Sequence, residues 1–220
     1  MKIKSLKLFI FFLVLQSFVA LYFTSKSYGE TNNIVSRIES KYKNVYSISS
    51  YFYQKEKIPG YSQNMSYKGY FYYKRHKGMV WIYEYPFHKK QILKNGRLYI
   101  VNKKNRKVTI INVSSKTGGF PPNVVEVIGN LTNYFKVINI FRNTSKNKII
   151  LVLKPIKLQR AKKIYVGFDP VNLKIESLKI LTYQGQTIVF KYKNVKFNGH
   201  IKNKIFSIVF PSYYKIKKAF

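Results

Sequence analysis

The stretch YKRHKGMVWIYEYP (Tyr73–Pro86) decides which fold the sequence predicts. It joins the end of one alternating segment, residues 65–75, to another, residues 79–85; both are rich in aromatic residues, and a short turn signal, His76-Lys77-Gly78, separates them. This pattern is typical of two antiparallel strands joined by a hairpin. Arg75 ends the first strand, and Trp81, the only tryptophan of the chain, lies in the second. A guanidinium therefore stands beside an apolar strand face, which a sealed core would not favour.

The same alternation recurs in both directions from this hairpin. Turn signals such as Pro59-Gly60, Asn95-Gly96 and Gln184-Gly185 separate the alternating segments and favour antiparallel neighbours joined by short connections. The two-residue period predicts strands at residues 47–57, 65–75, 79–85, 90–94, 97–102, 106–113, 137–142, 148–154, 162–168, 172–183, 186–197 and 204–210.

Two segments break this period and predict helices. In residues 31–45, apolar side chains recur every three or four residues. Residues 124–138 follow Pro121-Pro122, which suits a helix start, and Gly129 favours a division into two short pieces. Because no linker is long enough to divide residues 30–220, we expect one mainly β domain with helices (α+β). A single curved antiparallel sheet, open or nearly closed, with helices on its concave face satisfies these elements.

The first 29 residues read as a cleaved secretory signal peptide. Three lysines precede Leu8–Phe23, an apolar run of about 16 residues that falls short of the ~20 a spanning helix needs. Ser27-Tyr28-Gly29 then places small residues before a cleavage point. A retained N-terminal anchor is the alternative. We therefore expect an exported, soluble mature protein, most simply in a bacterial periplasm.

The chain is strongly basic, with 41 Lys and Arg against 7 Asp and Glu and a net charge of +34. Such a charge would suggest nucleic acid in a cytoplasmic protein, but export disfavours that partner. The lysines are spread through every segment rather than gathered in one stripe. A solvated basic surface and an attraction to anionic membrane surfaces both remain compatible with this charge.

The lysine-free faces of the two strands around the opening hairpin are the candidates for the inside of the sheet. These faces consist of Tyr67, Gly69, Phe71, Tyr73 and Arg75 in the first strand, and Met79, Trp81, Tyr83 and Tyr85 in the second. The donors of Arg75 need acceptors, and backbone carbonyls at a helix C-terminus would serve. Arg75 would then hold a helix over the mouth of an apolar cavity; alternatively, it reaches water at the strand end.

Five short motifs follow one another along the chain. They are Tyr51-Phe52-Tyr53-Gln54, Gly69 to Arg75, Trp81-Ile82-Tyr83-Glu84-Tyr85-Pro86, Asn95-Gly96-Arg97, and Phe206-Ser207-Ile208-Val209-Phe210-Pro211. In this order, behind a signal peptide, they resemble the LolA family, periplasmic carriers of outer-membrane lipoproteins. The sequence departs from the family pattern at His76, where the family often has proline, and at Met79, where an aromatic residue is common.

The resemblance implies an unclosed β-barrel of about eleven strands with a helical lid. It implies that the arginine matching Arg75 bonds the lid backbone and acts as a latch. It also implies a cavity for the acyl chains of a lipoprotein. We assign the cavity lining to Phe71, Tyr73, Met79, Trp81 and Tyr83, and the lid to Val124, Val127, Ile128 and Leu131.

The partners implied by the resemblance are lipoproteins bound for the outer membrane, an inner-membrane ABC transporter that releases them, and an outer-membrane acceptor. We expect a monomer that needs no cofactor, no metal and no nucleic acid. The related outer-membrane receptor is disfavoured because it needs a lipidated cysteine and the chain has none. A carrier of another lipid, such as a phospholipid or glycolipid, stays open.

An enzyme is the alternative from a different class. The histidines, His76, His88 and His200, are scattered and show no metal-ligand spacing. The sequence contains no G-x-S-x-G motif and no obvious close pair of acids. We therefore expect no catalytic residues.

Overall fold

The computed structural model describes residues 33–113, 124–143, 147–156 and 161–219. The chain divides into two compact units, Met1–Ile38 and Glu39–Phe220. Residues 33–38 of the first unit are helical, and so are residues 39–43 of the second, which we call the end of the leading helix. The predicted signal peptide, residues 1–29, lies outside the described residues. Everything that follows concerns the second unit.

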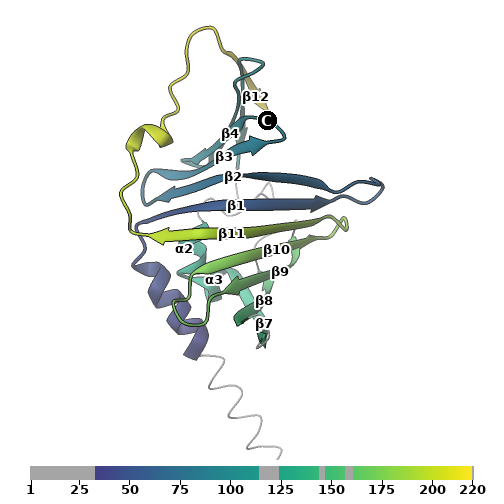
Figure 1. The fold of residues 1–220 in the computed structure, drawn as a ribbon, viewed down its shortest axis with the longest axis vertical. Coiled ribbons are helices and arrows are strands. Elements are labelled where there is room, and N and C mark those ends of the chain that lie inside the picture. Colours follow the sequence, from purple (N-terminus) through teal and green to yellow (C-terminus); the bar gives the residue numbers. More distant parts are fainter. Residues whose placement is uncertain (1–32, 114–123, 144–146, 157–160, 220) are drawn as a thin grey trace, which may run out of the picture. The chain divides into compact units, whose positions relative to one another are not determined.

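A twelve-stranded sheet makes up most of this unit (Figure 1). The strands are β1 (Ser47–Lys57), β2 (Met65–Lys74), β3 (Gly78–Tyr85), β4 (Lys89–Lys94), β5 (Arg97–Asn102), β6 (Lys107–Asn112), β7 (Phe135–Asn143), β8 (Lys148–Pro155), β9 (Ala161–Phe168), β10 (Ile175–Thr182), β11 (Thr187–Phe197) and β12 (Lys215–Ala219). Their spatial order is β12-β6-β5-β4-β3-β2-β1-β11-β10-β9-β8-β7. Because β12 and β7 end this order without pairing with each other, the sheet is unclosed, as predicted.

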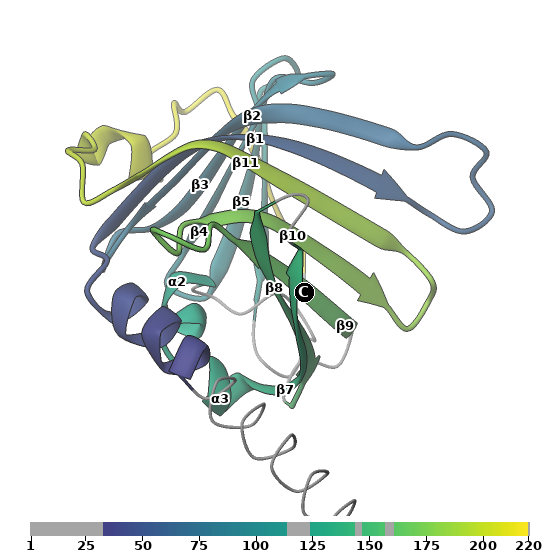
Figure 2. The same cartoon turned by 60° about the horizontal axis from the view of Figure 1, so that its bottom comes forward.

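The sheet curves strongly around a concave side (Figure 2). Two short helices, α2 (Val124–Ile128) and α3 (Leu131–Tyr134), connect β6 to β7, and Ile128 of α2 faces the same cavity as the strands. Neighbouring strands pair antiparallel, with one exception: β12 runs parallel to β6, from Lys215 beside Lys107 to Ala219 beside Ile111. None of the helices in the described residues combines the length and the hydrophobicity needed to cross a membrane.

The predicted helix at residues 124–138 is too long. The helical segment ends at Tyr134, and β7 begins at Phe135. From Phe135 onward the chain pairs with β8, where Val137 lies opposite Leu153 and Phe141 opposite Ile150. Pairing with a neighbouring strand therefore overrides the helical spacing of the apolar residues. The predicted division of the helix is correct, since Gly129 and Asn130 separate α2 from α3.

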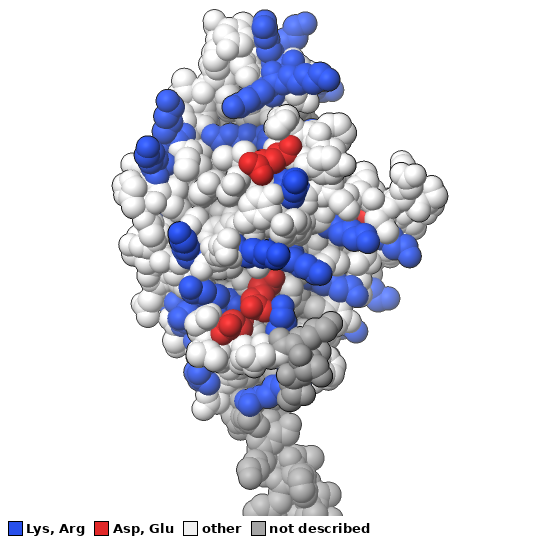
Figure 3. Space-filling model, viewed as in Figure 1, with Lys and Arg blue, Asp and Glu red and all other residues white. Residues whose placement is uncertain are grey.

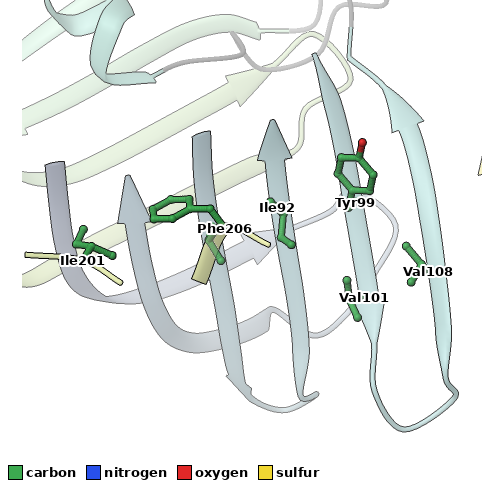
Figure 4. Close-up of a cluster of buried hydrophobic side chains, with 7 residues drawn as sticks. Ile92, Tyr99, Val101, Val108, Ile201 and Phe206 are labelled. Atoms are coloured by element: carbon green, nitrogen blue, oxygen red, sulfur yellow. The ribbon is translucent and has the colours of Figure 1, made fainter. Parts of the chain in front are cut away.

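The predicted strand at residues 204–210 is wrong. The 3₁₀ helix η3 (Asn203–Phe206) occupies its first half, and the final strand, β12, comes later. Ile201 and Phe206 pack on the outer face of β3 to β6, where they complete a buried cluster with Val80, Ile92, Tyr99, Val101 and Val108 (Figure 4). A segment that crosses the face of a sheet finds no free strand edge, so its apolar residues form no ladder.

Gly69 of β2 lies close to the backbone of β3. A Cβ atom at this position would stand 1.9 Å from the backbone oxygen of Ile82. We expect Gly69→Ala to lower the free energy of unfolding by about 1–3 kcal/mol, because β3 would have to move. Gly199→Ala is the control, since nothing lies within 4 Å of its Cβ position. Urea denaturation would check this, and equal stability of the two variants would contradict the close approach.

Candidate functional site

A cavity of about 580 Å³ lies on the concave side of the sheet. This volume is within the range of small-molecule binding sites. Most of the wall is apolar and comes from strands far apart in the sequence. The apolar lining consists of Ile48, Phe71, Trp81, Leu93, Leu98, Ile111, Val113, Ile128, Ile175, Leu178, Ile188 and Phe190. The polar lining consists of Tyr42, Ser50, Gln54, Glu56, Tyr83, Gln91, Asn112 and Tyr192.

Aromatic rings form the middle of the wall. Phe71 and Trp81 are cross-strand partners in β2 and β3, and their ring centroids lie 5.4 Å apart. Tyr192 of β11 stacks on Phe190 at 6.1 Å and lies 6.2 Å from Phe71. Rings held in this way present a broad apolar surface with little rotamer freedom to lose on binding.

Three of the five residues predicted to line the cavity lie on its wall: Phe71, Trp81 and Tyr83. Tyr73 and Met79 are partners across the β2–β3 pair and are almost fully buried, at 2% and 1% exposure, but they do not line the cavity. Tyr73 instead borders a second cavity, of about 320 Å³, together with Tyr42, Arg75 and residues of α2.

The residues predicted to form the lid lie in α2 and α3. Val127, Ile128 and Leu131 are buried, and Ile128 lines the large cavity. Val124 begins α2. The sequence analysis missed the contribution of β11, where Ile188, Phe190 and Tyr192 line the wall. Their signal was present, because these three residues alternate with Lys191 and Lys193, which lie on the other face of β11.

Arg75 binds the end of the leading helix. Its guanidinium donates hydrogen bonds to the carbonyl of Lys43 and, at 3.0 Å, to the carbonyl of Val45. Its backbone N–H donates to the carbonyl of Tyr46 at 2.8 Å. The last carbonyls of a helix lack partners within the helix and attract cations, so the arginine satisfies them. Toward α2, Arg75 borders the second cavity.

One end of the large cavity is polar. The hydroxyl of Tyr83 donates to Oε1 of Gln54 at 3.0 Å, and Nε2 of Gln54 donates to the carboxylate of Glu56. A third cavity, of about 120 Å³, adjoins this end and shares Gln54, Glu56, Tyr83 and Gln91 with the large one. Tyr67, Phe87 and Lys89 complete its lining.

The hydroxyl of Ser50 lies in β1, the strand that carries Gln54 and Glu56. Ser50 is 5% exposed and lines the large cavity, and its Oγ has no hydrogen-bond partner among the described residues. A buried hydroxyl left unpaired is unfavourable. A carbonyl group of a ligand in the cavity would find a donor there.

Burial raises the pKa of three tyrosines on the wall far above their usual range. For Tyr83 the negative charge of Glu56 adds to the effect of burial on the pKa. For Tyr192 the nearby Tyr83 raises the pKa further. For Tyr42 a hydrogen bond that its hydroxyl accepts from the backbone N–H of Ile175, at 2.9 Å, partly opposes the effect. These hydroxyls therefore keep their protons and stay available as donors.

Within the described residues, Glu56 is the one charged side chain on the wall of the large cavity. All three histidines are exposed, and none lines the large cavity. Within the described residues, no group of three or more His, Cys, Asp and Glu side chains is arranged to hold a metal ion. Lys and Arg side chains are spread over the whole face seen in Figure 3, with acidic side chains in only a few places. The basic charge thus forms no single stripe on this face.

The chain is similar to known lipoprotein carriers. The family model described as "Outer membrane lipoprotein carrier protein LolA" matches residues 43–209. A protein of Francisella philomiragia named outer-membrane lipoprotein carrier protein is 30% identical over 175 residues, which are 78% of this chain and 82% of that protein. Its namesake in Francisella tularensis subsp. novicida is 28% identical over 177 residues, 80% of this chain and 83% of that protein.

A solved structure with little sequence similarity shares the fold. An uncharacterized conserved protein from Thermus thermophilus superposes with a TM-score of 0.53 at 8% identity, covering 86% of this chain and 99% of that chain. At such low identity the likeness concerns the fold alone.

The raised pKa of Tyr192 predicts a loss of stability in alkali. Above pH ~10 the hydroxyl ionises in the unfolded chain but stays protonated in the folded one. Ionisation lowers the free energy of the unfolded state, so the free energy of unfolding falls as the pH rises. The slope is about 1.4 kcal/mol per pH unit for each such group. We expect Tyr192→Phe to flatten the fall in unfolding free energy between about pH 10 and 11, measured by urea denaturation. Tyr61→Phe, on an exposed turn, is the control and should match the wild type.

Proposed function

Because the chain belongs to the LolA family of outer membrane lipoprotein carrier proteins, we propose that it carries the acyl chains of lipoproteins in its apolar cavity. In this proposal it acts in the periplasm as a chaperone without enzymatic activity. It takes lipoproteins released from the inner membrane by an ABC transporter and passes them to an acceptor at the outer membrane. The observation that carries the proposal is the aromatic-walled cavity of about 580 Å³ on the concave side of the sheet.

The cavity has the chemistry that an acyl chain needs. Each CH₂ group of an acyl chain in water costs about 0.8 kcal/mol, so a lipidated cysteine does not cross an aqueous compartment unaided. Phe71, Trp81 and Phe190 offer a surface on which these groups can be buried. Ile128 brings α2 against the same space, so a shift of this short helix would widen or close it.

In this proposal, the hydrogen bonds of Arg75 hold the carrier closed only weakly. The two side-chain hydrogen bonds of Arg75 hold the end of the leading helix, and each contributes about 1 kcal/mol net. A bias of this size is small enough for cargo binding to overturn. Since Arg75, the helix end and α2 all border the second cavity, displacement of the helix end can be passed on to α2.

A release experiment tests the proposal. Purified mature protein is incubated with spheroplasts that hold a radiolabelled lipoprotein, and the soluble fraction is examined for a complex. We expect soluble complex only with ATP and only when the lipoprotein carries its lipidated cysteine. Absence of complex, together with phospholipid or glycolipid that co-purifies with the protein, would replace the proposal with a carrier of another lipid on the same fold.

A charge on the cavity wall should prevent acyl binding. Trp81→Glu places a carboxylate among Phe71 and its neighbours, where an acyl chain could not pair with it. We expect binding of a lipidated peptide to weaken at least about tenfold, measured by equilibrium dialysis. Tyr53→Glu, on the opposite, exposed face of β1, is the control. Wild-type binding by Trp81→Glu would remove Trp81 from the binding site.

Removal of Arg75 should slow the delivery of cargo without preventing its binding. We expect Arg75→Leu to bind cargo but to transfer it to an acceptor membrane more slowly, because the helix end loses two hydrogen bonds. Arg97→Leu removes an exposed arginine from β5 and is the matched control. Transfer would be followed with a labelled lipoprotein, and a normal rate for Arg75→Leu would refute the role in closure.

A further inference from the structure

A carboxylate lies on the wall of the apolar cavity in a chain that has few of them. The chain contains 7 acidic residues against 41 basic ones. Among the described acidic residues, Glu56 is the one that lines the large cavity, and it also lines the adjoining polar cavity. It therefore stands at the junction of the apolar and polar parts of the site.

Hydrogen bonds orient this carboxylate. An ionised carboxylate only accepts hydrogen bonds, so the amide of Gln54 must turn its Nε2 toward Glu56. The Oε1 of Gln54 then points the other way and accepts the hydroxyl proton of Tyr83 at 3.0 Å. Burial and the charge of Glu56 both raise the pKa of Tyr83, which keeps this hydroxyl a donor. The hydrogen bonds are thus donated from Tyr83 to Gln54 and from Gln54 to Glu56, where the series ends.

The positive charges nearby do not neutralise Glu56. Within the described residues, no lysine or arginine forms an ion pair with it. Lys89 lines the adjoining polar cavity, but its ammonium is placed over the ring of Phe87, 5.0 Å from the ring centroid. A negative charge that is oriented, partly buried and without a cationic partner favours a cation or a strong N–H donor in the ligand.

We infer that Glu56 binds an ammonium group at the polar end of an acylated ligand whose chains occupy the large cavity. This inference rests on the proposed function and narrows its substrate class to amphiphiles with a free amine. The acyl chains lie along Phe71 and Trp81, and the amine meets Glu56 beside Gln54. An ammonium of this kind has two chemical sources, the free α-amino group of a diacylated N-terminal cysteine and the ethanolamine headgroup of a phospholipid.

The test compares two ligands that differ only at the amine, which is free and charged in one and acetylated and neutral in the other. One is a synthetic peptide whose N-terminal cysteine carries two acyl chains and a free α-amino group; the other is the same lipopeptide with that amine acetylated. Trp81 is the only tryptophan of the chain and lies on the cavity wall, so its fluorescence reports binding directly. We expect the free amine to bind about tenfold more tightly than the acetylated form.

Substitution of the carboxylate should abolish this preference. In Glu56→Gln the side chain keeps its shape and can still accept from Gln54, so we expect both lipopeptides to bind with nearly equal affinity. Glu84→Gln is the matched control, because Glu84 is exposed on β3 and does not line the cavity. It should keep the full preference.

The outcomes separate this inference from the proposed function. Equal binding of the two lipopeptides by the wild type, or a preference that survives in Glu56→Gln, would overturn the ammonium site and leave the acyl cavity standing. Failure of both lipopeptides to bind would overturn both proposals. A second arm compares phosphatidylethanolamine with its N-acetylated form. A preference there that depends on Glu56 supports the site and identifies ethanolamine as a source.

Discussion

An apolar concave face that its own side chains leave unfilled is the constraint on which the rest of the structure depends. Protein interiors are close-packed, and voids larger than a water molecule are few. The space of about 580 Å³ beside Phe71 and Trp81 therefore forgoes contacts that a filled core would make. An acyl chain that enters this space recovers those contacts. The proposed carrier would then need no rearrangement of its sheet to bind apolar cargo.

Stability that the inner face cannot supply comes from the outer face of the same strands. Val80 and Ile92 are completely buried beneath the segment that contains Ile201 and Phe206, whereas Trp81 and Leu93, their immediate neighbours, face the cavity. Because side chains alternate between the two faces of a strand, β3 and β4 contribute both to the outer cluster and to the cavity wall. The outer cluster holds the strands in register, so the inner face can stay empty without collapse of the sheet.

The two ends of the site differ in chemistry, and this difference suits an amphiphile. The aromatic wall carries no charge, whereas the bonded series Tyr83, Gln54 and Glu56 places a carboxylate at the end that adjoins the third cavity. A ligand with apolar chains and a polar head would enter in one orientation. Arg75 and the end of the leading helix border the second cavity rather than this polar end, so the proposed closure and the proposed recognition of the head involve different residues.

The sequence by itself determined most of the strands, the curved unclosed sheet and the family. The first six predicted strands agree with β1 to β6 within one residue at each end, because a two-residue period and nearby turn signals are local properties. The motifs from Tyr51 to Pro211 led to the LolA family, and the family match over residues 43–209 confirms that resemblance. Lysine-free faces also located Phe71, Trp81 and Tyr83 on the inside.

Only the tertiary structure decided what each buried face contacts. Tyr73 and Met79 share the pattern of Phe71 and Trp81, yet they are buried outside the cavity wall. Residues 204–210 alternate like a strand, yet they cross the outer face of the sheet, and β12 takes the edge beside β6. The junction at Glu56 depends on β1, β3 and β4 coming together. Alternation reports only that a residue faces inward, and long-range packing determines whether it meets another side chain, another segment or an empty space.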